Sequence, residues 1–118
     1  MVVVRALSLF LLIGFSINVF AARATLVTTV DRVLVTTGGA FGNCMAYLNQ
    51  PLRPLGVDCP DQWVTFSCSG DIVPRSEAKG LFETAQIALA TGKDVRVYVT
   101  DSAKHNGYCF ANRVDLFR

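Results

Sequence analysis

The stretch from Ser76 to Thr100, SEAKGLFETAQIALATGKDVRVYVT, contains a helix followed directly by a strand. Its apolar residues recur at helical spacing, which predicts an amphipathic helix with Ser76 as N-cap. Gly92 is the residue type that ends helices, and Val95 to Thr100 then alternates apolar and polar residues as a half-buried strand does. The other elements are placed in the sequence relative to this helix and strand.

Strands are expected both before and after this junction. The segment Thr25–Thr37 is rich in Val and Thr and predicts one long strand, or two short strands bent near Asp31-Arg32. A polar turn, Asp101–Gly107, carries the hairpin signal Asn106-Gly107. The other expected strands are Cys44–Leu48, Gln62–Cys68 and Tyr108–Phe117.

The expected order is therefore three strands, one helix and two strands, in a mainly β domain. Five strands with a helix between the third and the fourth is the order of the OB-fold, a small Greek-key barrel. An open antiparallel sheet with one helix across it is the alternative. We favour the OB-fold-like barrel, because a small domain has few other ways to hide the edges of its sheet.

The first 22 residues have the layout of a secretory signal peptide. Arg5 gives a positive start, an apolar run follows, and Ala21-Ala22 offers small residues for cleavage after either one. The uncharged run is at the short end of the roughly 17–25 residues that a membrane-spanning helix needs. We expect residues 1–22 to be removed, residues 23–118 to form a single domain, and the protein to be secreted or periplasmic.

Charge excludes one large class of partner. Without Arg5, ten of the eleven basic residues remain against nine acidic ones, so the mature domain is nearly neutral. Nucleic-acid binding selects for basic patches, so no nucleic-acid partner is expected. No membrane span is expected after cleavage of the signal peptide.

The four cysteines all lie after the signal peptide, which favours two disulfides in an oxidising compartment. No C-x-x-C pair occurs and His105 is the only histidine, so neither a zinc site nor any other metal or cofactor is expected. In the predicted barrel the second and third strands are antiparallel neighbours and the third and fifth are parallel ones. That arrangement favours Cys44–Cys68 with Cys59–Cys109, while Cys59–Cys68 would close the shortest loop and is the main competitor.

The segment Leu81–Val99, in which a helix ends at Thr91-Gly92 and runs into Val-Arg-Val-Tyr-Val, resembles the B subunits of bacterial A–B toxins. The likeness is to the subtilase-cytotoxin and typhoid-toxin type. It implies an OB-fold, a homopentameric ring, an enzymatic A subunit as partner and binding of cell-surface glycans. The cysteine positions and the 101–108 turn depart from that family, so no sugar-binding residue is carried over.

Candidate ligand-binding residues follow from the strand pattern instead. Outward-facing aromatic residues stack on sugar rings or fill subunit interfaces, arginine pairs with acidic groups, and the polar turn offers hydrogen-bonding side chains. Each of these residue types also occurs on ordinary solvated or helix-covered surfaces. The candidates are Trp63, Arg96, Tyr98, Asp101, Asn106 and Tyr108.

Catalytic constellations are weak. His105 has Asp101 and Ser102 nearby, but three residues of one turn cannot support a triad on both sides of a substrate. Glu77 and Glu83 lie six residues apart on the helix and do not face each other. The sequence favours a secreted, non-catalytic binding module, with a small exported structural or inhibitory domain that binds a protein partner as the alternative.

Overall fold

The computed structural model describes residues 13, 14, 16 and 21–118. Most of the expected signal peptide, residues 1–12, 15 and 17–20, therefore lies outside the described residues. The elements are β1 (Arg23–Thr28), β2 (Val30–Val35), the short 3-10 helix η1 (Ala40–Asn43), β3 (Cys44–Leu48), a second 3-10 turn η2 (Arg53–Leu55), β4 (Trp63–Thr65), α1 (Arg75–Thr91), β5 (Val95–His105) and β6 (Tyr108–Leu116).

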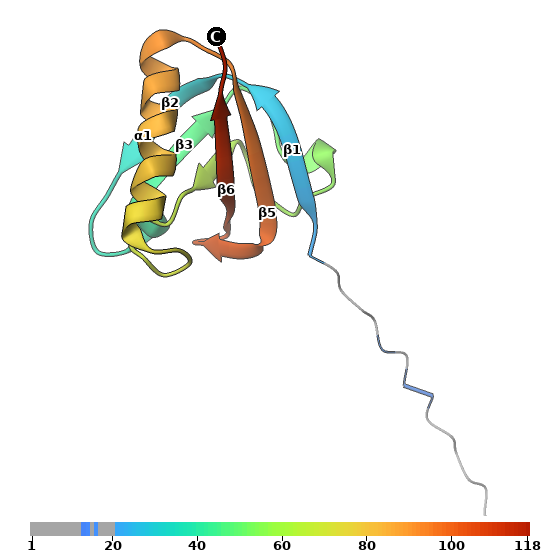
Figure 1. Cartoon of the computed structure of the whole chain (residues 1–118). Coiled ribbons are helices and arrows are strands. Elements are labelled where there is room, and N and C mark those ends of the chain that lie inside the picture. Colours follow the sequence, from blue (N-terminus) through green and yellow to red (C-terminus); the bar gives the residue numbers. More distant parts are fainter. Residues whose placement is uncertain (1–12, 15, 17–20) are drawn as a thin grey trace, which may run out of the picture.

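The strands form one six-stranded mixed sheet in the order β1-β5-β6-β4-β3-β2, and α1 lies along one side of it (Figure 1). Neighbouring strands are antiparallel except β4 and β6, which run parallel and meet at Thr65 and Phe110. The expectation of a mainly β domain with one helix after the strand at 63–65 is confirmed.

The expectation of a closed five-stranded barrel is corrected, because the sheet is open. Among the described residues β1 pairs with β5 and β2 with β3, but β1 and β2 do not pair with each other. Of the two alternatives for Thr25–Thr37, two short strands are formed, but they are separated at Thr29 and not near Asp31-Arg32. The Thr29 carbonyl accepts a hydrogen bond from Asn49 N–H at 3.1 Å. A register shift follows between Val30 and Arg32. β1 and β2 are the two edge strands of the sheet, and only Thr29 separates them in the chain. The two edges are therefore joined at this bend through the backbone, without strand pairing.

The helix agrees with its apolar pattern except at its start. It begins at Arg75 after Pro74, which is extended and offers no side-chain cap, so Ser76 is a helical residue and not the N-cap. Pro74 replaces it because its carbonyl accepts hydrogen bonds from the first turn. Gly92 ends the helix as expected, with a φ of 68° and its N–H bonded to the carbonyl of Ala88 at 2.9 Å.

Two further strand ends differ from the sequence expectation by several residues. The third expected strand stops at Thr65, because the chain turns at Ser67, whose φ is 61°. The expected polar turn 101–107 is mostly strand, since β5 continues to His105 across a register shift and only Asn106-Gly107 forms the turn. Both turn residues have positive φ, as this type of hairpin requires.

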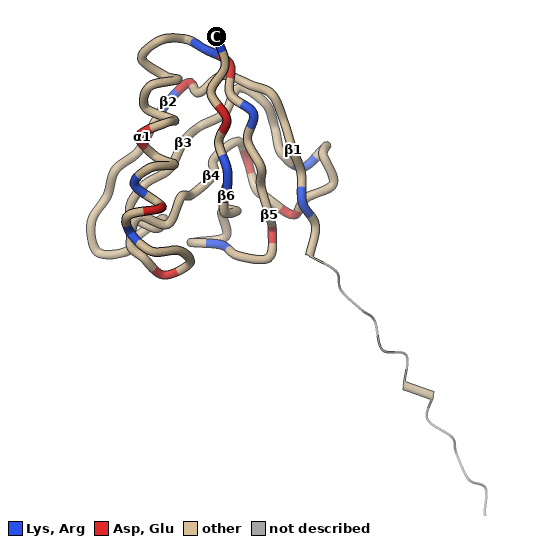
Figure 2. The backbone as a smooth tube through the Cα atoms, viewed as in Figure 1, with Lys and Arg blue, Asp and Glu red and all other residues tan. Residues whose placement is uncertain are grey.

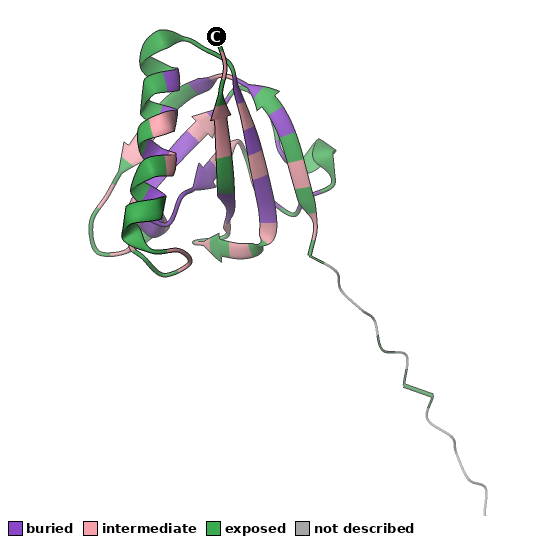
Figure 3. Ribbon diagram, in the orientation of Figure 1, coloured by how far each residue is buried: buried purple, intermediate pink, exposed green. Residues whose placement is uncertain are grey.

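The core lies between α1 and the concave side of the sheet. In Figure 3 one side of the helix and alternate residues of β5 are buried. Phe82 of the helix packs on Phe66 with ring centroids 6.2 Å apart. Acidic and basic residues are interspersed over the domain (Figure 2), in keeping with its nearly neutral charge.

Two disulfides join the segments around the sheet. They are Cys44–Cys68, with Cα atoms 5.6 Å apart, and Cys59–Cys109, with Cα atoms 5.5 Å apart. These are the pairs that the strand order favours, and the competing Cys59–Cys68 bridge is not formed. The disulfides suggest an oxidising compartment.

Candidate functional site

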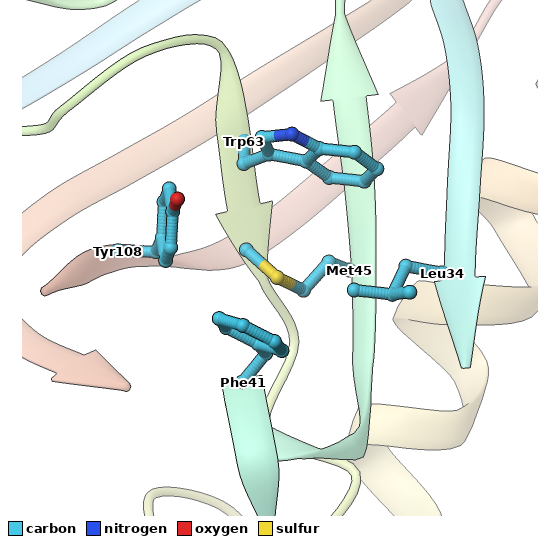
Figure 4. A pocket seen from close by; sticks show the side chains of 5 residues that line it. All are labelled: Leu34, Phe41, Met45, Trp63 and Tyr108. Carbon is cyan, nitrogen blue, oxygen red and sulfur yellow. The ribbon is translucent and has the colours of Figure 1, made fainter. Parts of the chain in front are cut away.

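A small hollow of about 160 Å³ opens on the outer side of the sheet (Figure 4). Trp63 and Phe41 lie on opposite sides of it, Tyr108 flanks them, and Met45 extends between them. The lining comes from five separate elements: Leu34 of β2, Phe41 of η1, Met45 of β3, Trp63 of β4 and Tyr108 of β6. Residues far apart in the sequence therefore build one aromatic site.

Strand register explains how most of these side chains reach the same side. Side chains alternate along a strand, so the cross-strand pair Ala46 and Val64 faces the core and their neighbours face outward. The outward pairs are Leu34 with Met45, Arg32 with Tyr47, and Tyr47 with Trp63. The disulfides hold two of the lining segments, because Met45 follows Cys44 and Tyr108 precedes Cys109.

Phe41 reaches the hollow through an unusual loop. Gly39, Phe41 and Gly42 have φ values of 83°, 55° and 68°, which turn the chain tightly over the sheet. Asn106 holds this loop, since its side-chain oxygen accepts a hydrogen bond from Phe41 N–H at 2.7 Å. The hairpin turn between β5 and β6 thus positions one wall of the hollow.

Aromatic contacts connect the residues of the walls. Phe41 and Tyr108 pack edge to face with centroids 5.8 Å apart, and Tyr47 and Trp63 do so at 5.1 Å. The guanidinium carbon of Arg32 lies 4.6 Å from the Tyr47 ring centroid and 5.6 Å from that of Trp63. Within the described chain Arg32 has no ion pair, so the site presents an uncompensated positive charge beside two aromatic rings.

A buried polar network lies behind Phe41. Ser67 Oγ lies 2.9 Å from His105 Nε2 and accepts a hydrogen bond from Ile72 N–H at 3.1 Å. Thr65 Oγ1 donates to the Phe41 carbonyl at 2.8 Å. His105, expected at a solvated hairpin tip, is instead half-buried in strand β5 and contacts this network. Ser67 is fully buried.

The structure divides the expected ligand-binding residues into three groups. Trp63 and Tyr108 line the hollow, and Asn106 supports it. Arg96 and Tyr98 lie on β5 away from it: Arg96 stacks on Phe117 at 5.0 Å, and Arg113 stacks on Tyr98 at 4.7 Å. Asp101 forms the third group, described next.

Asp101 binds backbone groups of the domain itself. Its two carboxylate oxygens accept hydrogen bonds from Ala22 N–H at 2.8 Å and from Asp58 N–H at 3.0 Å. These two bonds, with the positive charge of Lys104, hold the pKa of Asp101 below its ordinary value of 3.8 despite some desolvation. Asp101 therefore fastens the start of β1 and the 58–59 segment to β5.

Sequence reasoning missed four residues of the site: Arg32, Leu34, Phe41 and Met45. Phe41 carried a usable signal, as an aromatic residue in the glycine-rich run Gly38–Gly42. Arg32 and Leu34 alternate in the Val- and Thr-rich segment, but their common side shows only once β2 is paired with β3. Met45 looked like an ordinary strand residue.

Other kinds of site find no support in the part of the chain that the structure describes. There no His, Cys, Asp and Glu side chains gather in a group suited to a metal ion. No helix formed by residues 21–118 is long and apolar enough to cross a membrane.

Comparison with protein-family models, curated proteins and solved structures finds no significant match to this chain.

Proposed function

We propose that this protein is an exported, non-catalytic binding module that holds one sugar ring of a cell-surface glycan in the aromatic hollow. The observation that carries the proposal is the convergence of Trp63, Phe41 and Tyr108 on a space of about 160 Å³. Pockets for drug-sized ligands measure about 300–1,000 Å³, so this one suits a single ring at the end of a larger molecule.

The chemistry of the walls fits a sugar. The C–H faces of a pyranose are apolar and lie well on aromatic rings, while its hydroxyls need a few fixed polar groups. Within the described chain neither the Trp63 indole N–H nor the Tyr108 hydroxyl has a hydrogen-bond partner. Both groups are therefore free to bond a ligand.

The strand order supports the likeness to toxin B subunits. If β1 and β2 are counted as two halves of one bent strand, the sheet order reads 1-4-5-3-2-1, with a parallel pair between the third and fifth strands. This is the connectivity expected of an OB-fold, although the two halves are not hydrogen-bonded to each other. The family likeness adds a ring of subunits and an enzymatic A subunit to the proposal.

The absence of catalysis is part of the proposal. Ser67 and His105 are the only serine–histidine pair within hydrogen-bonding distance in residues 21–118. Ser67 Oγ is buried and already accepts the Ile72 N–H. A nucleophile must reach its substrate, so this pair serves the fold.

A second candidate is an exported domain that inserts an apolar side chain of a protein partner into the same hollow. Leu34 and Met45 make one side of the hollow fully apolar. An apolar wall of this kind also fits an apolar side chain of a protein.

Binding to an array of glycans, followed by calorimetry on the best ligand, tests the first candidate. We expect Trp63→Ala to weaken sugar binding at least about tenfold, as loss of a central aromatic anchor does. Tyr98→Ala is the matched control, because Tyr98 is also a half-buried strand aromatic but lies outside the hollow. Equal losses in both variants, or an array without signal for the folded protein, would contradict sugar binding and favour the protein partner.

Sedimentation of the exported protein tests the assembly separately. A ring of about five protomers agrees with the toxin-like proposal. A clean monomer at high concentration contradicts that assembly and leaves the sugar site to be judged by the array.

A further inference from the structure

Ala22, the residue just before β1, is fastened to the domain by Asp101 on both its backbone groups. Ala22 N lies 2.8 Å from Asp101 Oδ1, and the Ala22 carbonyl accepts a hydrogen bond from Asp101 N–H at 3.1 Å. Ala22 is half-buried whereas Ala21 is exposed. Among the described residues, Ala22 is the first whose backbone groups bond to the domain.

We propose that the exported protein is cut between Ala21 and Ala22, and that the new α-ammonium group of Ala22 forms an ion pair with Asp101 that anchors the start of β1. This inference rests on the expected signal peptide and is independent of the sugar-binding proposal.

The chemistry of the cut is simple hydrolysis by a peptidase of the export machinery. Water adds across the Ala21–Ala22 peptide bond, so Ala21 leaves with a carboxylate and Ala22 N becomes an ammonium group. One amide N–H is thereby replaced by a positively charged group with three N–H donors. At 2.8 Å from a carboxylate oxygen this change turns a neutral donor into a charged one, so the hydrogen bond becomes an ion pair.

Two observations favour this bond over the next one. Cleavage sites carry small residues at the last position and two before it. Cutting after Ala21 places Val19 at the second of these positions, whereas cutting after Ala22 places the bulky Phe20 there. Cutting after Ala22 would also remove the Ala22 nitrogen and carbonyl, the two groups that bond to Asp101.

The surroundings of Asp101 leave room for a positive charge. Its other oxygen accepts the Asp58 N–H at 3.0 Å. Lys104 is the neighbouring cation, but its ammonium group lies against the Asp58 side chain at 3.2 Å and the Asp58 carbonyl at 2.6 Å. Oδ1 of Asp101 is therefore left for Ala22. Asp58 precedes Cys59, so the anchored terminus also contacts the segment of the Cys59–Cys109 disulfide.

The first experiment exports the full chain from a bacterial host and determines the N-terminus of the product by intact mass and terminal sequencing. We expect Ala22. An N-terminus at Arg23, or at any other residue, overturns the proposal.

The second experiment tests the ion pair with a double-mutant cycle in urea. The exported protein is compared with a form that keeps Ala21, made by removing a tag in vitro, each with and without Asp101→Asn. We expect the extra residue to lower the folding equilibrium constant about two- to fivefold when Asp101 is present and to have no effect with Asp101→Asn. An equal effect in both backgrounds overturns the ion pair.

A salt series keeps the test decisive if Asp101→Asn does not fold. With Asp101 intact, the difference between the two N-terminal forms should shrink at 1 M NaCl, because salt screens a partly exposed ion pair. A difference that is absent at low salt, or unchanged by salt, counts against the proposal.

Discussion

Replacing Gly42 by alanine is the sharpest test of how the loop over the hollow is held. Gly42 is buried and has a φ of 68°. An added Cβ would lie 2.5 Å from Thr65 Oγ1 and 2.7 Å from His105 Cδ2. Thr65 cannot easily move, because its hydroxyl donates to the Phe41 carbonyl and accepts the Ser67 N–H. The loop therefore has no room for even one methyl group.

The expected loss has two parts. A left-handed backbone costs a residue with a side chain about 1–2 kcal/mol. Forcing a methyl group into a packed site costs typically about 1–3 kcal/mol more. Gly42→Ala should thus lower the free energy of unfolding by about 2–5 kcal/mol, against a total of roughly 5–15 kcal/mol for a domain.

Gly38→Ala is the matched control. Gly38 belongs to the same loop and has a φ of 75°, but nothing lies within 4 Å of its added Cβ. It should therefore lose only the backbone part, about 1–2 kcal/mol. Urea unfolding of both variants measures the difference. Equal losses would refute the close packing of Gly42 against Thr65 and His105, and with it the account of how Phe41 is placed.

Two further predictions concern the disulfides and Asp101. Non-reducing peptide mapping of the exported protein should give Cys44–Cys68 and Cys59–Cys109 peptides. Each bridge should stabilise the fold by about 3–4 kcal/mol from loop entropy. A Cys59–Cys68 peptide would contradict the strand order. Because the pKa of Asp101 is lowered in the folded state, chiefly by the Asp58 and Ala22 N–H groups, its stabilising effect is present above pH 3.8 and lost as the pH falls through the folded value. The urea midpoint of Asp101→Asn should therefore lie below that of the unchanged protein near neutral pH and converge with it in acid, and a gap that persists at the lowest pH would argue against this carboxylate as the cause.

Local chemistry explains what could be predicted from the sequence. The helix follows from a periodic apolar stripe ended by Gly92, and the hairpin from Asn106-Gly107, because each signal depends on residues close together in the chain. Even the disulfide pairs followed once the strand order was assumed, since each bridge requires only that two strand ends be neighbours.

Long-range packing decided the rest. The break at Thr29 depends on Asn49, and the turn at Ser67 occurs where its side chain meets His105 and Ile72. None of these three partners is visible from the local pattern, which put the alternative bend of the first segment near Asp31-Arg32 and continued the third expected strand to Cys68.

The candidate site was only partly visible for the same reason. Aromatic residues on outward strand positions pointed to Trp63, Tyr98 and Tyr108 alike, because alternation assigns a face but not a place on that face. In the folded sheet Tyr98 lies away from Trp63 and Tyr108. Phe41, from a glycine-rich loop, packs against Tyr108 instead. The sequence by itself determined which residue types this protein offers for binding, whereas the tertiary structure decided which of them meet, since their contacts join segments that only the folded sheet brings together.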